Sequence, residues 1–303
     1  MKDSLANPPR HPDVRAVETR MNAKVYRRLN DYLRNLLGRT GLYERAKASW
    51  IYDFYWTIAD RRIIEDRRRE IEFYRNLLYG FRAGDLIFDV GANQGYKADI
   101  FLRLGAELVA IEPDEANQEI LKQKFLKYRL KSRPFVVFAK AVSDRSALEK
   151  MWIDTPGSAK NTLSQKWADT LRGDDRRFGH RLSFGHWKEV ETVTIEQLIT
   201  TYGLPFFVKI DVEGHELSVL RGMRRPVPYL SFEVNLPEFK PEGEECVQVL
   251  GHLARDGKFN YTHDCRRGLI LKEWLGMHEF LAVLNSCSDE SIEVFWKTSA
   301  LET

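Results

Sequence analysis

Cysteine is scarce in this sequence, which has three in 303 residues: Cys246, Cys265 and Cys287. They are scattered, odd in number and never spaced as Cys-x-x-Cys. We therefore expect neither a disulfide framework nor a cysteine-based zinc site. Proteins without disulfides are typical of reducing compartments, so the sequence favours a cytoplasmic location.

Long hydrophobic runs are also missing. No segment approaches the roughly 18 apolar residues that a membrane-spanning helix needs. The first residues, MKDSLANPPRHPDV, contain no apolar core of the kind found in secretory signals. Hydrophobic residues still make up 43% of the chain and charged residues 30%, which is typical of a globular protein with a sizeable core. We expect no transmembrane segment, and nothing in the sequence indicates an oligomeric state.

Neither sign of charge dominates, since 47 Lys and Arg face 44 Asp and Glu. The basic residues gather at one end, where residues 1–80 hold 17 Lys and Arg against 11 Asp and Glu. A basic surface can face anionic lipid, nucleic acid or an acidic partner. Acidic residues interleave with the arginines here, which favours a solvated helix face. We expect no nucleic-acid partner, while contact of the N-terminal helices with a membrane surface stays open.

The spacing of apolar residues divides the chain at about residue 80. Residues 1–80 show helical spacing, beginning after Asp13, and we predict an N-terminal helical extension there. From residue 81, short apolar runs alternate with helical stretches, which is typical of a parallel sheet with helices on both faces. Residues 81–303 then form one α/β domain, with a polar insertion or lid at 147–190. Strands are expected at 86–90, 108–111, 134–139, 206–212 and 229–234, near Asn260 and at 280–284.

A glycine-rich turn follows the first expected strand, in LIFDVGANQGYKADIF. Gly91, Asn93 and Gly95 form this turn, and Glu112 lies 21 residues beyond Gly91, after the next strand. An acid at that distance typically binds the hydroxyl groups of a ribose. The turn lacks the Gly-x-Gly-x-x-Gly pattern of dinucleotide sites. A nucleoside-bearing cofactor other than a dinucleotide is therefore favoured over a tight turn without a ligand.

The charge beside the turn narrows the choice of cofactor. Asp89 lies immediately before it, where a carboxylate would repel a pyrophosphate but attract a cation. S-adenosylmethionine has an ammonium and a sulfonium group next to its ribose, so the pattern favours this cofactor over NAD. Ser143 or Asp144, after the third strand, could reach its adenine, because strand ends line the crevice of such sheets. Asp144 could instead cap a turn.

Five segments carry a family resemblance: FDVGANQG, AIEPD, AVSD, VTIEQL and FVKIDVEGHELSVLRG. In their order and spacing, over roughly residues 71–284, the sequence resembles the FkbM-type methyltransferases. The resemblance implies a class I methyltransferase fold, Rossmann-like with a mostly parallel seven-stranded sheet, and S-adenosylmethionine as cofactor. Known members methylate hydroxyl groups on sugars or polyketides. The resemblance also implies cofactor binding by Asp89, Gly91, Asn93, Gly95 and Glu112.

The fourth expected strand, in PFFVKIDVEGHELSVL, carries ionisable residues at every second position. Alternate residues of an extended chain share a side, so Lys209, Asp211 and Glu213 would point one way unless the following turn intervenes. Methyl transfer to a hydroxyl needs a base. Asp211 or His215 can serve, with Glu233 of the fifth strand orienting base or substrate. Two alternatives stay open: these acids and His215 bind a divalent metal, or they form an ion-pair network that fixes the turn. We favour base chemistry without a metal.

The insertion at 147–190 is expected to close over the acceptor, and Lys209, Asn161 and His186 are the candidate acceptor contacts. The sequence thus predicts an S-adenosylmethionine-dependent O-methyltransferase. Its acceptor would be a small molecule or glycan, with the hydroxyl on a carbohydrate, a polyketide or a lipid-linked group. The alternatives are an NAD-linked sugar-modifying enzyme and a non-catalytic Rossmann-like binding module that uses its basic N-terminal helices.

Overall fold

The computed structural model describes residues 61–126, 128, 135–173, 177 and 182–299. The chain divides into two compact units, residues 1–65 and residues 66–303. The helices predicted within residues 1–60 lie outside the described residues. No helix in the described ranges is both long and apolar enough to cross a membrane.

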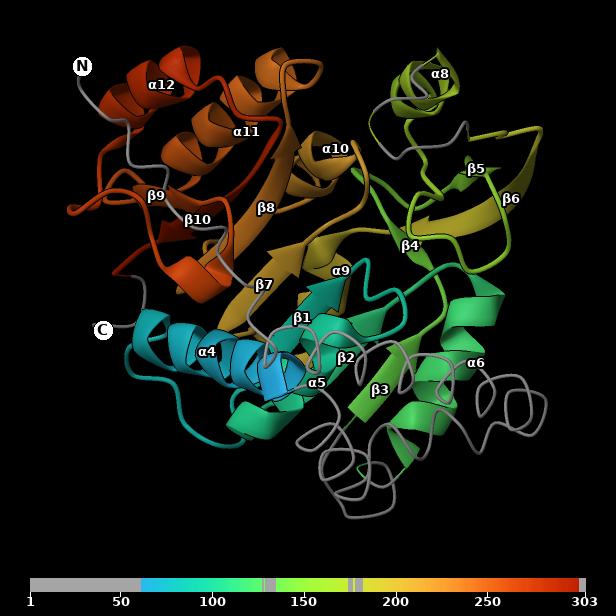
Figure 1. Ribbon diagram of the computed structural model, residues 1–303, viewed down its shortest axis with the longest axis horizontal. Coiled ribbons are helices and arrows are strands. Elements are labelled where there is room, and N and C mark those ends of the chain that lie inside the picture. The colour runs from blue at the N-terminus through green and yellow to red at the C-terminus, as the bar shows by residue number, and fades with distance from the viewer. Residues whose placement is uncertain (1–60, 127, 129–134, 174–176, 178–181, 300–303) are drawn as a thin grey trace, which may run out of the picture. The chain divides into compact units, whose positions relative to one another are not determined.

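The main sheet has seven strands in the order β3-β2-β1-β7-β8-β10-β9 (Figure 1). Neighbouring strands are parallel except around β10, which is antiparallel to both β8 and β9. The class I methyltransferase fold expected from the sequence is confirmed. The strand order reverses between β1 and β7, the point at which doubly wound sheets bind ligands. The strands are β1 (Leu86–Val90), β2 (Glu107–Ile111), β3 (Phe135–Phe138), β7 (Phe207–Ile210), β8 (Tyr229–Asn235), β9 (Lys258–Thr262) and β10 (Ser291–Lys297).

Helices cover both faces of this sheet, because its central strands carry apolar side chains on both sides. On one face α4, α5 and α6 pack around Tyr74 and Phe101 in one apolar cluster. On the other face α9, α10, α11 and α12 pack around Leu198, Leu250 and Phe280. These helices are α4 (Arg61–Leu77), α5 (Tyr96–Leu104), α6 (Glu115–Lys124), α9 (Ile195–Tyr202), α10 (Glu216–Arg221), α11 (Lys240–Leu253) and α12 (Met277–Ser286).

The strand predicted at 280–284 is wrong, because these residues lie inside α12 and the last strand is β10. Phe280 and Leu284 are buried four residues apart, whereas Ala282 between them is exposed. A strand on the core would bury alternate residues, and a helix buries residues three or four apart. The prediction of a strand at FLAVL therefore rested on the apolar composition of this run and not on the spacing of its buried residues.

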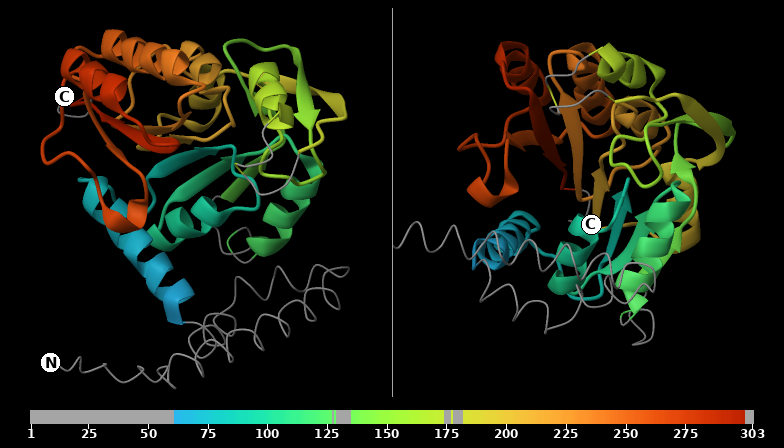
Figure 2. Two further views of the ribbon diagram at one scale, coloured as in Figure 1. Left: turned by 45° about the horizontal axis from the view of Figure 1, so that its top comes forward. Right: turned by 45° about the vertical axis from the view of Figure 1, so that its right-hand side comes forward.

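The insertion is not an irregular polar segment, as its composition had suggested. It contains β5 (Leu148–Ile153), α8 (Gln165–Gly173) and β6 (His186–Val193), and with β4 (Ala141–Val142) it forms a second sheet in the order β4-β6-β5. Trp167, Leu171 and Phe184 form an apolar cluster of its own that also includes Phe239 of the main domain. Figure 2 shows this subdomain beyond the carboxyl ends of the central strands, beside α6.

Candidate active site

The glycine loop after β1 lies against the residue that follows β7. Gly91 has a φ of 81°, and a Cβ atom there would lie 1.8 Å from the carbonyl oxygen of Asp211. No side chain fits in that space, so glycine is required for both conformation and close approach. The two strand ends at the reversal of the sheet are therefore in direct contact.

Glu112, at the end of β2, ties the two neighbouring loops together. Its carboxylate accepts hydrogen bonds from the backbone N–H groups of Asn93 (2.7 Å) and Asp114 (2.8 Å). Burial raises the pKa of Glu112 to about 7, although these two N–H groups oppose the shift. Asp114 caps α6 by accepting from the N–H groups of Ala116 and Asn117. The predicted ribose-binding acid is thus held in place by backbone donors.

A central cleft opens between these loops and the insertion. Its lining includes Gly91, Asn93, Glu112, Asn117, Asn161, Asp211, Glu213 and His215. The cleft is narrow, with a volume of about 50 Å³, because the segment 155–161 lies over it. Asn161 Nδ2 and the Gly157 N–H both donate to Asp114 Oδ2, at 2.9 and 3.1 Å. The segment 155–161 is therefore tied to the acid that caps α6.

Two buried oxygen-bearing groups at the site have no partner among the described residues. Both carboxylate oxygens of Asp89, a residue 1% exposed, lack a hydrogen bond, and so does Oδ1 of Asn117 in the cleft wall. Burial raises the pKa of Asp89 to about 6, against the ammonium group of Lys209 on the adjacent strand. Buried polar groups normally have partners, so these oxygens are acceptors suited to a ligand that brings donors.

Four of the predicted cofactor residues, Asp89, Gly95, Ser143 and Asp144, are not among the residues that line the cleft. Gly95 has a φ of 75°, and its Cα faces Leu121 and Phe125 of α6, where a Cβ would lie 2.6 Å from each side chain. Ser143 is buried, with Oγ 3.0 Å from Nε2 of His215. Asp144 is partly exposed and pairs with Arg145.

A carboxyl cluster of Asp211, Glu213 and Glu233 lies where β7 and β8 end. Oxygen atoms of the three side chains lie within 4.8 Å of one another. Lys209 Nζ donates to Asp211 Oδ2 at 2.9 Å, and Lys160 Nζ of the insertion donates to Glu213 Oε1 at 2.8 Å. Two of the three carboxyl groups are therefore already bonded to ammonium groups.

Other contacts fix the cluster's second and third members. Trp167 Nε1 donates to Glu213 Oε2 at 2.9 Å, and the Ser291 hydroxyl donates to Glu233 at 2.7 Å. Glu213 has a φ of 54°, which breaks the extended chain and turns it out of line with Lys209 and Asp211. The predicted common side of these three residues therefore ends at Asp211, because the turn intervenes.

Their surroundings drive the pKa values of these acids apart. Burial alone would raise the pKa of Asp211, but the ammonium groups of Lys209, Lys160 and Lys97 together outweigh burial and hold it below its usual range. Burial, with Asp211 close by, raises the pKa of Glu213 despite Lys160. Burial and the charges of Asp211 and Glu213 raise the pKa of Glu233 well above its usual range. Groups with pKa values shifted apart suit different roles in proton transfer, and Asp211 is the member whose pKa is lowered.

His215 begins α10 and faces the same cleft. Burial lowers its pKa, although the carboxylate of Glu149, 3.8 Å from Nε2, opposes the shift. The turn before it is held by Glu216, whose carboxylate accepts from the N–H groups of Val212 and Gly214 at 3.0 and 3.2 Å. His215 is therefore a neutral imidazole in a fixed turn.

A polar cavity of about 420 Å³ lies beside the start of α5. Lys97 projects from α5 into a group formed by Glu70 of α4, Glu293 of β10 and Cys265. Burial alone would lower the pKa of Lys97, but Glu293, Cys265 and Glu70 together raise it above its usual range. The cavity is lined by Glu70, Tyr96, Lys97, Thr262, His263, Asp264, Cys265, Arg266 and Glu293.

Comparison with known proteins assigns a family to this site. Residues 89–261, which include the glycine loop, the acid of β2 and the carboxyl cluster, match the family described as the methyltransferase FkbM domain. The chain belongs to the FkbM methyltransferase family. It is an S-adenosylmethionine-dependent methyltransferase, as its segments had indicated. No curated protein shows a significant sequence match to it.

Several solved structures are similar to this FkbM methyltransferase in part. A SAM-dependent methyltransferase from Agrobacterium tumefaciens is 8% identical with a TM-score of 0.39; the match covers 77% of this chain and 62% of that one. A TehB-like SAM-dependent methyltransferase from Corynebacterium glutamicum is 10% identical, with a TM-score of 0.38 and coverage of 76% and 88%. An O-methyltransferase from Bacillus cereus in complex with SAH is 12% identical, with a TM-score of 0.37 and coverage of 76% and 81%.

The donor and acceptor groups around the central cleft fit S-adenosylmethionine. Asn117 in the cleft wall offers an unpartnered amide oxygen to an N–H donor, and the unpartnered carboxylate of Asp89 is buried directly before Val90 and Gly91, which line the cleft. Glu112 has further lone pairs for hydroxyl groups beyond the two backbone bonds that it accepts. We assign Asp89, Asn93, Glu112 and Asn117 to hold the cofactor. Asn117 was missed in the sequence, although it lies in the first turn of the helix that follows the motif AIEPD.

The three predicted acceptor residues lie at different places. Lys209 is 4% exposed and bonded to Asp211. Asn161 lines the central cleft, bonded to Asp114. His186 is exposed at the start of β6, where it pairs with Ile153. Lys160, which the sequence reasoning missed, reaches Glu213 from 53 residues away, a distance at which no local pattern could have indicated the contact.

Proposed function

We propose that this FkbM methyltransferase transfers its methyl group to a hydroxyl oxygen and that Asp211 accepts the hydroxyl proton. One observation carries the proposal: the Asp211 carboxylate accepts a hydrogen bond from the Lys209 ammonium group, and its backbone touches the glycine loop at Gly91. Its side chain is 39% exposed and lines the central cleft. It is therefore accessible to an acceptor beside the loop that would hold the cofactor.

When bound, S-adenosylmethionine supplies an electrophilic methyl group whose bond to sulfur breaks as the acceptor oxygen attacks. The protein's own task is to orient the hydroxyl and to remove its proton as the new carbon–oxygen bond forms. Lys209 acts as a positioning residue, because its ammonium group fixes Asp211 and keeps it ionised. Glu233, whose raised pKa favours the protonated form, can donate a hydrogen bond to the acceptor or to Asp211.

His215 is the second candidate for the base. Its lowered pKa leaves the imidazole neutral near pH 7, so a ring nitrogen can accept a proton. Its Nε2 already interacts with Ser143 Oγ, however, at 3.0 Å. We favour Asp211, whose second carboxylate oxygen is not used by Lys209.

A divalent metal is the alternative to a base. Carboxylate oxygens within 4.8 Å of one another have the spacing of a metal site. Against it, the ammonium groups of Lys209 and Lys160 already lie against two of the three carboxyl groups. Methyl transfer in the presence of EDTA decides between the two, since a metal-dependent enzyme loses activity and a base-dependent one keeps it.

We infer that the acceptor's hydroxyl belongs to a carbohydrate, a polyketide or a lipid-linked group and that it approaches through the polar cavity. Both acids and bases line that cavity, and its Lys97 is close enough to Asp211 to help lower the pKa of that carboxyl. Mixed charge of this kind suits a group with several hydroxyls better than an apolar ring. The free cysteines Cys246, Cys265 and Cys287 are consistent with a reducing, cytoplasmic setting for the reaction.

The test is methyl transfer from radiolabelled S-adenosylmethionine to a panel of sugars, polyketides and lipid-linked sugars. We expect label in a methyl ether, retained with EDTA, lost in Asp211→Asn and only partly reduced in His215→Gln. Label on nitrogen or carbon would contradict O-methylation. Full activity in Asp211→Asn with none in His215→Gln would indicate that His215, and not Asp211, is the base.

A further inference from the structure

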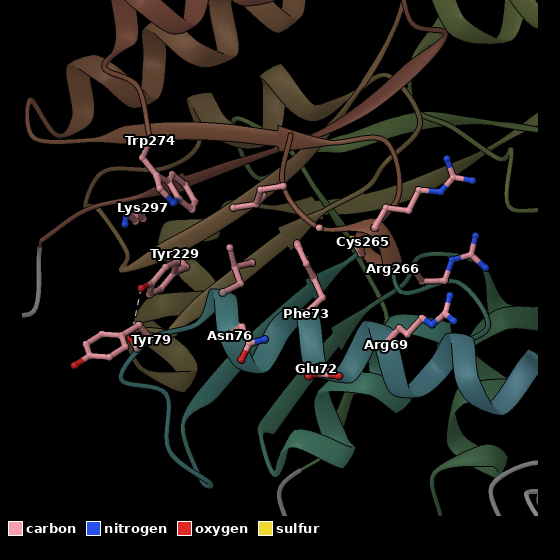
Figure 3. Close-up of a pocket in the computed structure, with 14 residues that line it drawn as sticks. Arg69, Glu72, Phe73, Asn76, Tyr79, Tyr229, Cys265, Arg266, Trp274 and Lys297 are labelled. Atoms are coloured by element: carbon pink, nitrogen blue, oxygen red, sulfur yellow. Dashed lines mark hydrogen bonds between the residues drawn. The ribbon is translucent and has the colours of Figure 1, made fainter. Parts of the chain in front are cut away.

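A groove larger than the polar cavity continues from that cavity along α4. This α4 groove has a volume of about 530 Å³ and lies between α4 and the segment 265–274 (Figure 3). Cys265 and Arg266 line both cavities, so the two adjoin at these residues. Whatever occupies the polar cavity can therefore extend into the groove.

Three arginines gather where the groove meets the polar cavity, and Asp264 lies 2.8 Å from Arg266 and 3.9 Å from Arg267. Arg69 of α4 and Arg266 lie at the same end of the groove in Figure 3, and Arg267 follows Arg266 in sequence. Arg266 is held by Asp66 at 2.9 Å and by Asp264 at 2.8 Å, which fixes its position. Arg69 is exposed and forms no ion pair with any residue that the structure describes. Glu72 is the one acid among the residues lining the groove.

The other end of the groove is aromatic and apolar. Trp274, Tyr229 and Tyr79 lie together there in Figure 3, with Tyr79 87% exposed. Lys297 Nζ lies 4.6 Å from the centre of the Trp274 ring. Phe73 lines the middle of the groove and packs edge-on against Phe295 of the core, with ring centres 5.5 Å apart. The apolar floor is thus part of the folded core.

The groove is long enough for a chain-like ligand. On β10, Glu293 lines the polar cavity and Lys297 lines the far end of the groove. Four residues of a strand span roughly 13 Å. Along this length the chemistry changes in a fixed order, from polar cavity to arginines to aromatic and aliphatic side chains.

We propose that the α4 groove binds the phosphate and the first part of the hydrocarbon chain of a lipid-linked acceptor. The proposal rests on the proposed function, because it assigns the polar cavity to the hydroxyl-bearing group of the same molecule. A sugar joined through phosphate to an isoprenoid or similar lipid has its parts in the order of the cavity, the arginines and the apolar floor. Arginine binds phosphate through several N–H donors at once, and the aromatic end would bury the hydrocarbon.

Calorimetry on the full chain tests this with three probes: farnesyl phosphate, farnesol and inorganic phosphate. We expect farnesyl phosphate to bind at least about tenfold more tightly than either fragment, because both halves of the groove then contribute. Arg69→Gln should weaken farnesyl phosphate about tenfold, as expected for one charged hydrogen bond to phosphate. Trp274→Ala should weaken both farnesyl phosphate and farnesol.

Arg68→Gln is the matched control, since Arg68 is exposed on the same helix but does not line the groove. Equal affinity of the wild type, Arg69→Gln and Arg68→Gln for farnesyl phosphate would overturn the proposal. So would displacement of farnesyl phosphate by a single-stranded RNA of similar affinity, which would indicate a nucleic-acid surface. S-adenosylhomocysteine is titrated in the same samples. If S-adenosylhomocysteine binds and farnesyl phosphate does not, only the assignment of the groove fails. If S-adenosylhomocysteine does not bind, the proposed function fails.

Discussion

The active site has two acidic sides, which we call its edges: one lies at the ends of β1 and β2, and the other at the end of β7. The two edges are built in different ways. At the end of β2, Glu112 is held by backbone N–H groups of Asn93 and Asp114, both within 19 residues of it. At the end of β7, Glu213 is held by side chains of Lys160 and Trp167, which come from 53 and 46 residues away. The first edge is made by local turns, and the second needs the insertion to fold against the main domain.

This difference matches the division between cofactor binding and methyl-transfer chemistry that we propose. Backbone donors keep their position whatever the neighbouring side chains do, which suits a site that must hold one invariant cofactor. Side chains from an inserted subdomain can change without disturbing the Rossmann-like core, which suits the half that meets the acceptor. We expect variants of the two edges to fail in different assays.

The largest effect should come from Asp211→Asn. Removing a general base typically lowers kcat by roughly 10²- to 10⁴-fold. The measurement is turnover with an acceptor that the wild type methylates. Asp144→Asn, a partly exposed carboxylate outside the cleft, is the control and should stay within about twofold. If both variants lose the same activity, the edge of β7 has no special part in the chemistry.

Asp89→Asn should change stability with pH. The folded state raises the pKa of Asp89 from 3.8 to about 6 by burial. It therefore binds the proton more tightly than the unfolded state does, and stability falls as pH rises through this window. Asparagine removes a cost of up to about 3 kcal/mol above pH 6 and almost nothing at pH 4. Urea unfolding at pH 4.5 and pH 8 measures this. No gain at pH 8 would show that Asp89 is not strained by burial.

Trp167→Phe should destabilise the edge of β7. It removes the hydrogen bond to the buried carboxylate of Glu213, which costs about 2 kcal/mol. Trp187→Phe in the same insertion is the control, because Trp187 is 43% exposed and its replacement should cost less than about 0.5 kcal/mol. Equal losses in the two variants would mean that the long-range contact to Glu213 adds no stability.

Cofactor affinity should rise with pH because of the two acids Asp89 and Glu112. The carboxyl groups of Asp89 and Glu112, with pKa values of about 6 and about 7, attract a cation and accept hydroxyl donors best when ionised. Between pH 5 and pH 8 the affinity for S-adenosylhomocysteine should increase by about tenfold if Asp89 must ionise and by about a hundredfold if Glu112 must ionise. Glu112→Gln should flatten part of this dependence. A pH-independent affinity in the wild type would contradict our assignment of these two acids.

What the sequence could predict follows the same division. Asp89, Gly91, Asn93 and Glu112 could be named as candidates from a turn after a strand, an acid after the next strand and the resemblance to the FkbM family, and their binding of the cofactor stays a prediction. The alternation of strands and helices likewise indicated the fold class. The run FLAVL at 280–284 failed because composition was weighed above period: Ala282 is exposed between two buried neighbours.

The rest could not be read from local patterns. The partners of Glu213 come from a subdomain whose own strands pair Trp152 with Trp187 across 35 residues. The turn at Glu213, with its φ of 54°, also removes this side chain from the row that alternation predicted. Lys97 meets Glu293 only because α5 and β10 come together in the fold. Contacts of this kind depend on tertiary packing, so no short motif could reveal them.

The most direct test of the account is titration of S-adenosylhomocysteine into two matched variants. Asp89→Asn and Asp211→Asn each replace one carboxylate by an amide of the same shape; Asp89 lies on β1, and Asp211 directly follows the neighbouring strand β7. We predict that Asp89→Asn weakens binding at least about tenfold, as expected when a charged partner is lost, and that Asp211→Asn leaves binding within about threefold. The opposite pattern, with affinity lost in Asp211→Asn and kept in Asp89→Asn, would contradict the division of the site into a cofactor edge and a chemical edge.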